Sequence, residues 1–180
     1  KLETGEKEEQ FIFVGRLERL KGIHVLLEAW KEFPDKKLIL CGIGPEEEWV
    51  RDYLNKNHMN QVELRGQVEH REVLRLLARS RALILPNLCY EGQSMVIMES
   101  YAVGTPVIAS DLGNPGNMVI PGVTGLKFPC SDVQALRKAI CQMEQMQEWD
   151  TETVYKNLYA EETNYAILYD IYRKVQEKNE

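Results

Sequence analysis

Two glutamates, Glu91 and Glu99, bracket seven residues that read as a turn followed by the first turns of a helix. Ser94 lies between them and is a favourable N-cap residue, because its hydroxyl can accept a hydrogen bond from the first turn. A helical path would set the two Cα atoms roughly 12 Å apart, at a rise of ~1.5 Å per residue. The paired carboxylates of glycoside hydrolases are closer, at ~5–9.5 Å. The two glutamates therefore suit the ends of one elongated ligand better than acid–base chemistry at one bond.

The segment between the glutamates could also bind an anion. Backbone N–H groups at a helix start have no intrahelical partner, and the helix dipole adds positive potential there. The N–H groups concerned belong to Gln93, Ser94, Met95 and Val96. A structural alternative stays open at this point, in which Glu91 caps the helix and Glu99 is a solvated helix residue.

Cationic side chains follow the first apolar run of the sequence. Gly15 ends the run 11–14, and Arg16 and Lys21 come shortly after it. A glycine lets a phosphate approach the backbone, and a helix starting near Ile23 would offer free N–H groups. The two cations would add charge-assisted hydrogen bonds. These residues suit a diphosphate, although two solvated surface cations are the simpler alternative.

Other kinds of site lack their residue pattern in this sequence. Gly42 and Gly44 resemble the start of a dinucleotide-binding motif, but Glu47 stands where the third glycine is needed. The sequence has no P-loop, no Asp-x-Asp pair to hold a metal ion on phosphates, and no Gly-x-Ser-x-Gly. The histidines stand alone along the chain, which favours structural or solvated roles for His24, His58 and His70.

Length and composition fit one globular domain. The chain has 180 residues, 44% of them apolar and 28% charged, which is enough to bury a core. Its net charge of −6 argues against general binding to nucleic acid. No apolar run approaches the ~18 residues of a membrane span, and the first residues are too charged for a signal peptide. Four cysteines without Cys-x-x-Cys spacing predict reduced thiols and a cytoplasmic location: Cys41, Cys89, Cys130 and Cys141.

Short β-rich runs alternate with amphipathic segments along the chain. The expected strands are residues 11–14, 37–41, 62–65, 82–85, 107–109 and 126–128. Such continuous apolar runs predict a mostly parallel sheet covered by helices on both faces. With right-handed crossovers, this is a doubly wound, Rossmann-like α/β fold. Ligands of such folds bind beyond the carboxyl ends of the strands, which is where Gly15, Gly42 and Gly66 fall.

Local patterns also predict where helices begin. Pro45 is expected to open a helix, and Ser131 with Gln134 forms a capping box for a helix from Val133 to about residue 146. Thr151 is expected to cap the next helix, and a final helix covers about residues 164–178. Residues 113–117 are rich in glycine and asparagine and predict a turn.

Together, these segments resemble the nucleotide-sugar-binding domain of a GT-B glycosyltransferase of the retaining family 4 group. The resemblance covers about residues 9–143. It runs through residues 11–17 with Lys21 and Gly22, then 40–45, 62–66, 91–99, 104–111 and 122–126. Two departures concern the segment 113–117, which lacks the family's frequent Gly-Gly-x-x-Glu, and Ser94, which replaces a glycine or proline.

The resemblance implies a role for each of these residues. Arg16 and Lys21 would bind the donor diphosphate and stabilise charge on the leaving group, and Glu91 would contact the transferred sugar. Glu99 would accept hydrogen bonds from the ribose, and the backbone of residues 93–96 would bind sugar and phosphate. The base pocket would be formed by Gly42, Gly44, Gly66, Gln67 and Val68. The implied reaction transfers a sugar from a UDP- or GDP-linked donor to a hydroxyl with retention, without a metal or other cofactor.

The resemblance further implies a division of the protein. Residues 1–10 would be the remnant of an interdomain linker and residues 11–180 a single donor-binding domain, with the N-terminal acceptor domain absent. Such a chain would bind a nucleotide sugar weakly without turnover, and any peripheral membrane association would come from the absent domain. Two alternatives remain, a non-catalytic nucleotide-binding module and a fragment of a GT-B sugar-nucleotide epimerase.

An apolar stripe marks the expected last helix. Its residues are Tyr165, Leu168, Tyr169 and Tyr172. We expect the stripe to pack on this domain. The alternative is that it packs on the absent domain, which would leave an exposed patch and favour dimers or aggregates of the isolated chain.

Overall fold

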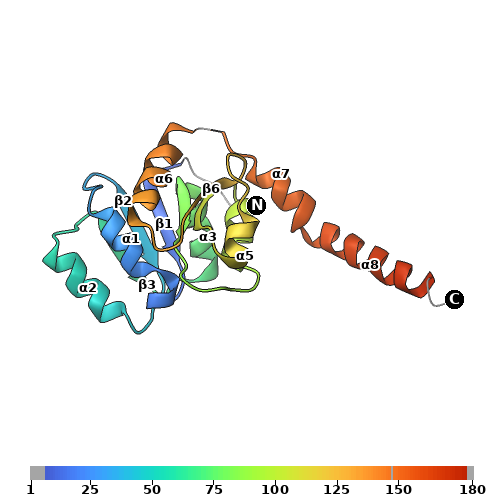
Figure 1. Cartoon of the computed structure of the whole chain (residues 1–180), viewed down its shortest axis with the longest axis horizontal. Helices are drawn as coiled ribbons and strands as arrows, with labels where there is room; N and C mark the ends of the chain where they lie inside the picture. Colours follow the sequence, from blue (N-terminus) through green and yellow to red (C-terminus); the bar gives the residue numbers. More distant parts are fainter. Residues whose placement is uncertain (1–6, 147, 178–180) are drawn as a thin grey trace.

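The computed structural model describes residues 7–146 and 148–177 of the chain. Within these residues, six strands form one sheet in the order β3-β2-β1-β4-β5-β6, and every neighbouring pair is parallel (Figure 1). The order reverses between β1 and β4, which confirms the predicted doubly wound fold. The strands are β1 (Gln10–Val14), β2 (Lys37–Cys41), β3 (Val62–Gly66), β4 (Ala82–Leu85), β5 (Val107–Ser110) and β6 (Gly125–Phe128).

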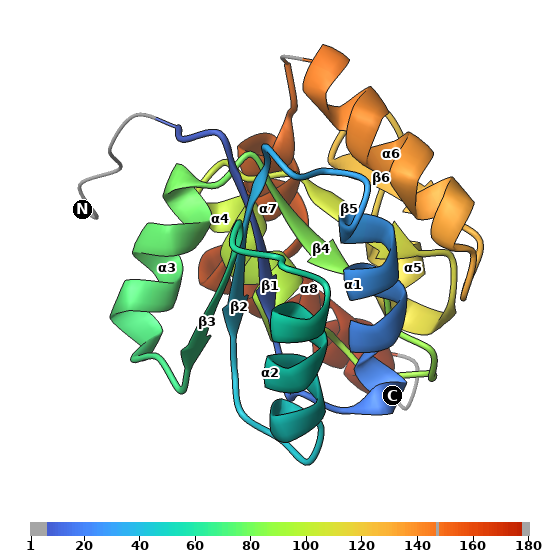
Figure 2. The ribbon, with the colours of Figure 1, turned by 90° about the vertical axis from the view of Figure 1, so that its left-hand side faces the viewer.

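Helices cover both faces of the sheet, as the apolar strands predict (Figure 2). Alternate strand residues point to opposite faces, so Phe11 and Phe13 enter one core and Ile12 the other. The first core is closed by α1 (Ile23–Trp30), α2 (Glu47–Lys56) and α6 (Val133–Gln145). The second is closed by α3 (His70–Arg79), α4 (Met95–Ala102) and α5 (Gly113–Met118).

The cap of α6 differs from the prediction. Asp132 occupies the N-cap, and its Oδ1 accepts a hydrogen bond from the Ala135 N–H at 2.9 Å. Ser131 has a φ of 67°, a left-handed conformation that places it one residue outside the helix. The predicted capping box of Ser131 and Gln134 is therefore wrong, because the neighbouring carboxylate takes the cap position.

Two other helices start at residues that the sequence does not predict. Pro45 stays in the loop before α2, which begins at Glu47, because the Glu46 N–H bonds back to the loop after β1 at 3.0 Å. Thr151 is the first residue of α7 (Thr151–Leu158) and makes no side-chain cap. Its side chain is buried instead, so the predicted Thr151 cap is wrong.

The glycine- and asparagine-rich stretch 113–117 forms most of α5 rather than an open turn. Gly113 enters it with a φ of 60°, a value that favours glycine. Pro115 lies in the first turn, where its missing N–H removes no intrahelical hydrogen bond. A short helix is therefore compatible with a composition that favours turns.

The chain before β1 is bound to the body of the molecule. The Lys7 ammonium donates to Thr105 Oγ1 at 2.9 Å and to the Ser80 carbonyl at 3.0 Å. Gln10, expected in the linker, is already the first residue of β1. Residues 1–6 of the expected linker lie outside the described residues.

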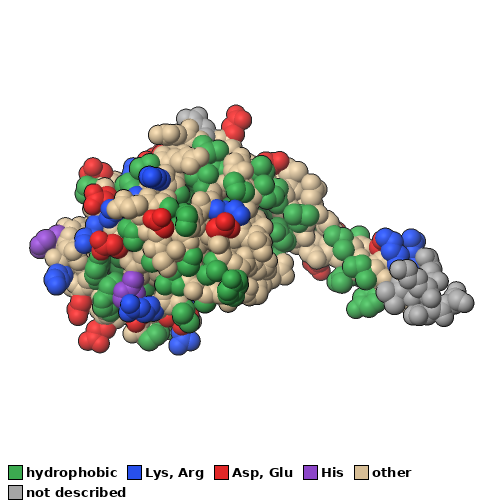
Figure 3. All heavy atoms as spheres, viewed as in Figure 1, with side chains coloured by type: hydrophobic (Ala, Val, Ile, Leu, Met, Phe, Trp, Pro, Cys, Tyr) green, Lys and Arg blue, Asp and Glu red, His purple; other side chains and the backbone are tan. Residues whose placement is uncertain are grey.

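The last helix, α8 (Glu161–Glu177), projects away from the sheet as an arm (Figure 1). It begins earlier than predicted, and residue 178 lies outside the described residues. The prediction that its apolar stripe packs on this domain is wrong, because Tyr165, Leu168, Tyr169 and Tyr172 are 50–70% exposed. Figure 3 shows apolar side chains along this arm. The sequence identifies the apolar face of the helix but not what covers it.

None of the described helices is long and apolar enough to cross a membrane.

Candidate functional site

The loops after β1, β2 and β3 are joined by backbone hydrogen bonds at the carboxyl edge of the sheet. The Gly15 N–H donates to the Cys41 carbonyl at 3.0 Å, and the Gly42 N–H donates to the Gly66 carbonyl at 2.7 Å. These bonds extend the ladder beyond the strands. They hold the three loops at one place, as the carboxyl-end rule predicts.

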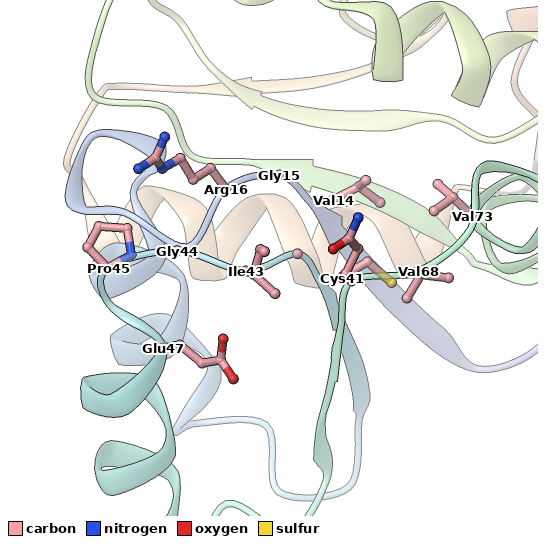
Figure 4. Close-up of a pocket in the computed structure, with 12 residues that line it drawn as sticks. Val14, Gly15, Arg16, Cys41, Ile43, Gly44, Pro45, Glu47, Val68 and Val73 are labelled. Atoms are coloured by element: carbon pink, nitrogen blue, oxygen red, sulfur yellow. The ribbon is translucent and has the colours of Figure 1, made fainter.

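A cavity of about 910 Å³ opens between these loops (Figure 4). Six of the residues predicted to bind the donor line it: Gly15, Arg16, Gly42, Gly44, Gln67 and Val68. The sequence reasoning missed other lining residues, Val14, Cys41, Ile43, Pro45, Glu47 and Val73. Most of these flank the motif glycines, so their position beside the motifs was the available signal.

Two glycines allow the loops to come this close. A Cβ on Gly42, whose φ is 142°, would lie 1.8 Å from the Gly15 carbonyl oxygen. A Cβ on Gly44 would lie 2.2 Å from the Leu17 carbonyl oxygen. Any side chain at either position would collide with backbone, so the shape of the cavity depends on glycine there.

The two ends of the cavity differ in chemistry. Val14, Cys41, Val68 and Val73 gather at one end, and Arg16 and Glu47 lie towards the other (Figure 4). Burial raises the pKa of the Cys41 thiol to about 11, so this side chain stays neutral. The cavity thus joins an apolar end that suits a planar base to a charged end, where Arg16 can bind phosphate and Glu47 is paired with Arg51.

Lys21 and Glu91 meet in an ion pair between Nζ and Oε1. Lys21 ends the 3₁₀ turn η1 (Arg19–Lys21), and Glu91 lies in the loop after β4. The two segments are joined because the Leu88 N–H donates to the Leu20 carbonyl at 2.8 Å. Both side chains are mostly buried, with 25% of Lys21 and 21% of Glu91 exposed. The structure therefore brings together two of the three predicted catalytic residues.

The third predicted catalytic residue, Arg16, has a more exposed side chain. Its Nε lies 3.4 Å from a carboxylate oxygen of Glu18, and 66% of its side chain is exposed. An exposed pair of this kind contributes little to stability. The guanidinium of Arg16 can therefore exchange Glu18 for another anion at small cost.

Glu99 contacts a histidine that the sequence reasoning treated as isolated. The Nε2 atom of His70 lies 3.0 Å from Glu99 Oε1. His70 is the first residue of α3 and follows the turn that carries Gln67 and Val68. Glu99 on α4 therefore faces the turn after β3. No periodicity in the sequence could have revealed this pairing, because it joins two different helices.

The start of α4 is as predicted, but its cap is not a side-chain cap. Met95 is the first helical residue and Ser94 holds the N-cap position, yet the Ser94 hydroxyl makes no capping bond. Ser94 is buried, whereas Met95 is 63% exposed. The remaining predicted residues do not line the cavity as the structure describes it: Lys21, Glu91, Glu99 and residues 93–96.

These predicted residues outside the cavity are called the second group below.

No three His, Cys, Asp or Glu side chains in the described part of the chain are grouped so that they could hold a metal ion. The carboxylates of the second group are each paired with a base instead. Glu91 pairs with Lys21 and Glu99 with His70. The chemistry that these residues offer is binding of anions and hydroxyl groups.

Comparison with known proteins decides the family. Residues 1–159 match the sequence pattern of the family described as Glycosyl transferases group 1. The chain belongs to this family. A glycogen synthase from Mycobacterium tuberculosis is 34% identical over 136 residues, which cover 73% of this chain and 33% of that protein. An uncharacterized glycosyltransferase from Methanocaldococcus jannaschii is 30% identical over 132 residues, covering 73% of this chain and 37% of that protein.

Solved structures of other proteins share the fold. Sucrose-phosphate synthase from Thermosynechococcus elongatus has a TM-score of 0.81 and 27% identity, with 98% of this chain and 47% of that chain covered. The Anabaena protein HepE in complex with UDP also has a TM-score of 0.81, at 21% identity, with 93% and 49% covered. The chain spans about a third of the curated relatives and about half of the solved chains. These findings confirm the predicted resemblance to the C-terminal domain of a GT-B glycosyltransferase.

Proposed function

We propose that this chain is the donor-binding domain of a glycosyltransferase that moves a sugar from a nucleoside diphosphate sugar to an acceptor hydroxyl. The observation that carries the proposal is the cavity of about 910 Å³ between the loops after β1, β2 and β3. Its size lies within the roughly 300–1,000 Å³ of small-molecule sites, and it joins an apolar end to an end that carries Arg16. The HepE complex with UDP has the same fold and supports a nucleotide as the ligand.

The donor would extend from the cavity to the second group of residues. The base and ribose would occupy the cavity, with Gly42, Gly44, Gly66, Gln67 and Val68 around the base. Glu99 would accept hydrogen bonds from the ribose hydroxyls, because an ionised carboxylate only accepts. The glycine backbone at Gly15 would allow the diphosphate to approach closely.

The diphosphate would lie between Arg16 and Lys21. As the bond between the anomeric carbon and the β-phosphate oxygen breaks, negative charge develops on the diphosphate. Two fixed cations stabilise that charge, which is how they would act in catalysis. The backbone N–H groups of residues 93–96, at the start of α4, would add further donors, and Glu91 would hold the transferred sugar.

Retention at the anomeric carbon and independence from metal are part of the proposal. Metal independence rests on the sequence, which has no Asp-x-Asp pair to hold a cation on the phosphates. Retention rests on the resemblance to family 4. We also propose a cytoplasmic protein whose acceptor binds to a second, N-terminal domain, so that this chain binds the donor without turning it over.

Calorimetric titration with UDP, GDP, ADP and their sugars tests the proposal. We expect at least one nucleotide to bind, and Lys21→Ala and Glu99→Ala each to weaken its binding about tenfold or more, since each removes a charge-assisted contact. Lys36→Ala is the matched control, because Lys36 forms a similarly buried pair with Glu144 just before β2, at the amino edge of the sheet. The proposal is wrong if the two site variants bind that nucleotide as the parent does.

A further inference from the structure

The Lys21–Glu91 ion pair joins two groups to which the proposed function gives different ligands. Lys21 would bind the diphosphate, and Glu91 would bind the transferred sugar. In the structure they bind each other, and among the described residues neither has another ion-pair partner. A diphosphate that binds the Lys21 ammonium competes with the Glu91 carboxylate for that cation and brings negative charge next to it.

Competition for Lys21 leaves Glu91 in a different state when the nucleotide carries a sugar than when it does not. An ionised carboxylate can only accept hydrogen bonds, so Glu91 needs donors in place of the Lys21 ammonium. Glu91 is 21% exposed, so water replaces the lost partner poorly, and the bound phosphates repel it. Hydroxyl groups of a sugar can donate to Glu91 and restore its pairing. A nucleoside diphosphate without a sugar leaves Glu91 unpaired beside like charge.

The backbone favours such an exchange at Glu91. Lys21 is held by the hydrogen bond between Leu88 and Leu20 and by the close approach of Gly22 to the Pro86 carbonyl. Glu91 lies outside any helix or strand, and it is followed by Gly92, where an added Cβ would meet no atom within 4 Å. The backbone at Lys21 is therefore held by its neighbours, whereas Glu91 lies in a loop with open space beside Gly92 on its C-terminal side.

We infer that Glu91 is a specificity-determining residue that favours the nucleoside diphosphate sugar over the sugar-free nucleotide. This inference rests on the proposed function. With the donor bound, both members of the pair gain a new partner: the phosphate replaces the carboxylate on Lys21, and sugar hydroxyls replace the ammonium on Glu91. Once the sugar has left, the carboxylate competes again for Lys21 and promotes release of the nucleoside diphosphate.

Glu91→Gln tests the inference, since it removes the charge and keeps the shape. The probes are UDP and UDP-glucose, or GDP and GDP-mannose if guanine nucleotides bind better, and the measurement is calorimetric titration. We expect the variant to bind the sugar-free diphosphate about tenfold more tightly than the parent and the nucleotide sugar no more tightly. The ratio of the two dissociation constants then falls about tenfold in favour of the sugar-free diphosphate.

Two further variants separate the possible outcomes. Glu144→Gln breaks the matched pair with Lys36, whose side chains are 25% and 28% exposed, and is expected to change neither affinity. If Glu91→Gln leaves the ratio unchanged while Lys21→Ala still weakens binding, the inference is wrong and the proposed function stands. An equal gain for both ligands also contradicts the inference, because Glu91 would then compete without discriminating. If Lys21→Ala has no effect on either ligand, Lys21 does not bind the diphosphate, and if Glu99→Ala is also without effect the proposed function itself fails.

Discussion

Gly42 determines how closely the loops after β1 and β2 approach, and with them the width of the cavity. We predict that Gly42→Ala lowers the free energy of unfolding by about 2 kcal/mol and weakens nucleotide binding. The added Cβ would lie 1.8 Å from the Gly15 carbonyl oxygen, and a φ of 142° strains any residue with a side chain. Urea unfolding and calorimetric titration measure the two effects.

Gly92→Ala is the control for this prediction. A Cβ there has no atom within 4 Å, so the change in unfolding free energy should stay within about 0.5 kcal/mol. Equal stability of the two variants would show that the loops after β1 and β2 are not in close contact.

Cys41, at the apolar end of the cavity, predicts a pH dependence of stability. Burial raises its pKa from 9.0 to about 11, so between these values the unfolded chain has lost a proton that the folded chain keeps. Stability contributed by the neutral thiol is present below pH 9 and is lost as the pH rises towards 11. In the Cys41→Val variant, the loss of unfolding free energy between pH 9 and 11 should be smaller by on the order of 2 kcal/mol, as measured by urea unfolding.

The exposed Cys141 provides the comparison for Cys41. Cys141→Ser should leave the pH dependence of stability as it is in the parent, because this side chain stays in contact with water in the folded chain. Identical slopes for the parent and Cys41→Val between pH 9 and 11 would contradict the burial of this thiol.

At the residue scale, sequence reasoning located one part of the site and missed another. The carboxyl-end rule placed Gly15, Gly42 and Gly66 at one edge of the sheet; the first two line the cavity, whereas Gly66 accepts the Gly42 N–H bond beside it. It could not predict that Glu99 meets His70. That contact depends on how the turn after β3 lies against α4 and on two side-chain rotamers, neither of which follows from spacing along the chain.

At the scale of single elements, the strands were predictable and the helix ends were less so. Buried runs such as 82–85 are apolar throughout, and β4 covers the same residues. Helix starts depend on hydrogen bonds to other parts of the chain. Glu46 is held by the loop after β1, and α2 therefore begins later than Pro45 suggests.

The cap of α6 gives a test at this scale. We predict that Asp132→Ala lowers the free energy of unfolding by about 1 kcal/mol, because it removes the acceptor for the Ala135 N–H. Ser131→Ala should change it by less than about 0.5 kcal/mol, since Ser131 lies outside the helix. A larger loss for Ser131→Ala than for Asp132→Ala, measured by urea unfolding, would restore the capping box that the sequence suggests.

At the scale of the whole molecule, α8 stands apart from the body (Figure 1). None of the α8 residues whose burial the structure describes belongs to either core cluster, whereas Tyr155 and Tyr159, in and just after α7, pack against the second one. We predict that a chain ending at residue 160 keeps its midpoint of thermal unfolding within about 3 °C and its affinity for nucleotide within about twofold.

A chain ending at residue 150 is the matched comparison, because it also removes α7. Its unfolding midpoint should fall by about 5 °C or more, since the two tyrosines no longer cover the core. A loss of the same size on removing α8 alone would show that the arm packs against the body.

The central claim is that a nucleotide occupies the cavity at the carboxyl edge of β1, β2 and β3. Amide chemical shifts, followed by NMR during a titration with UDP or GDP, test it most directly. We predict that the largest shifts fall on Gly15, Gly42, Gly44 and Val68, with smaller ones at Lys21 and Glu91. Shifts gathered instead around the separate hollow between Asn55 and Leu64 would contradict the claim.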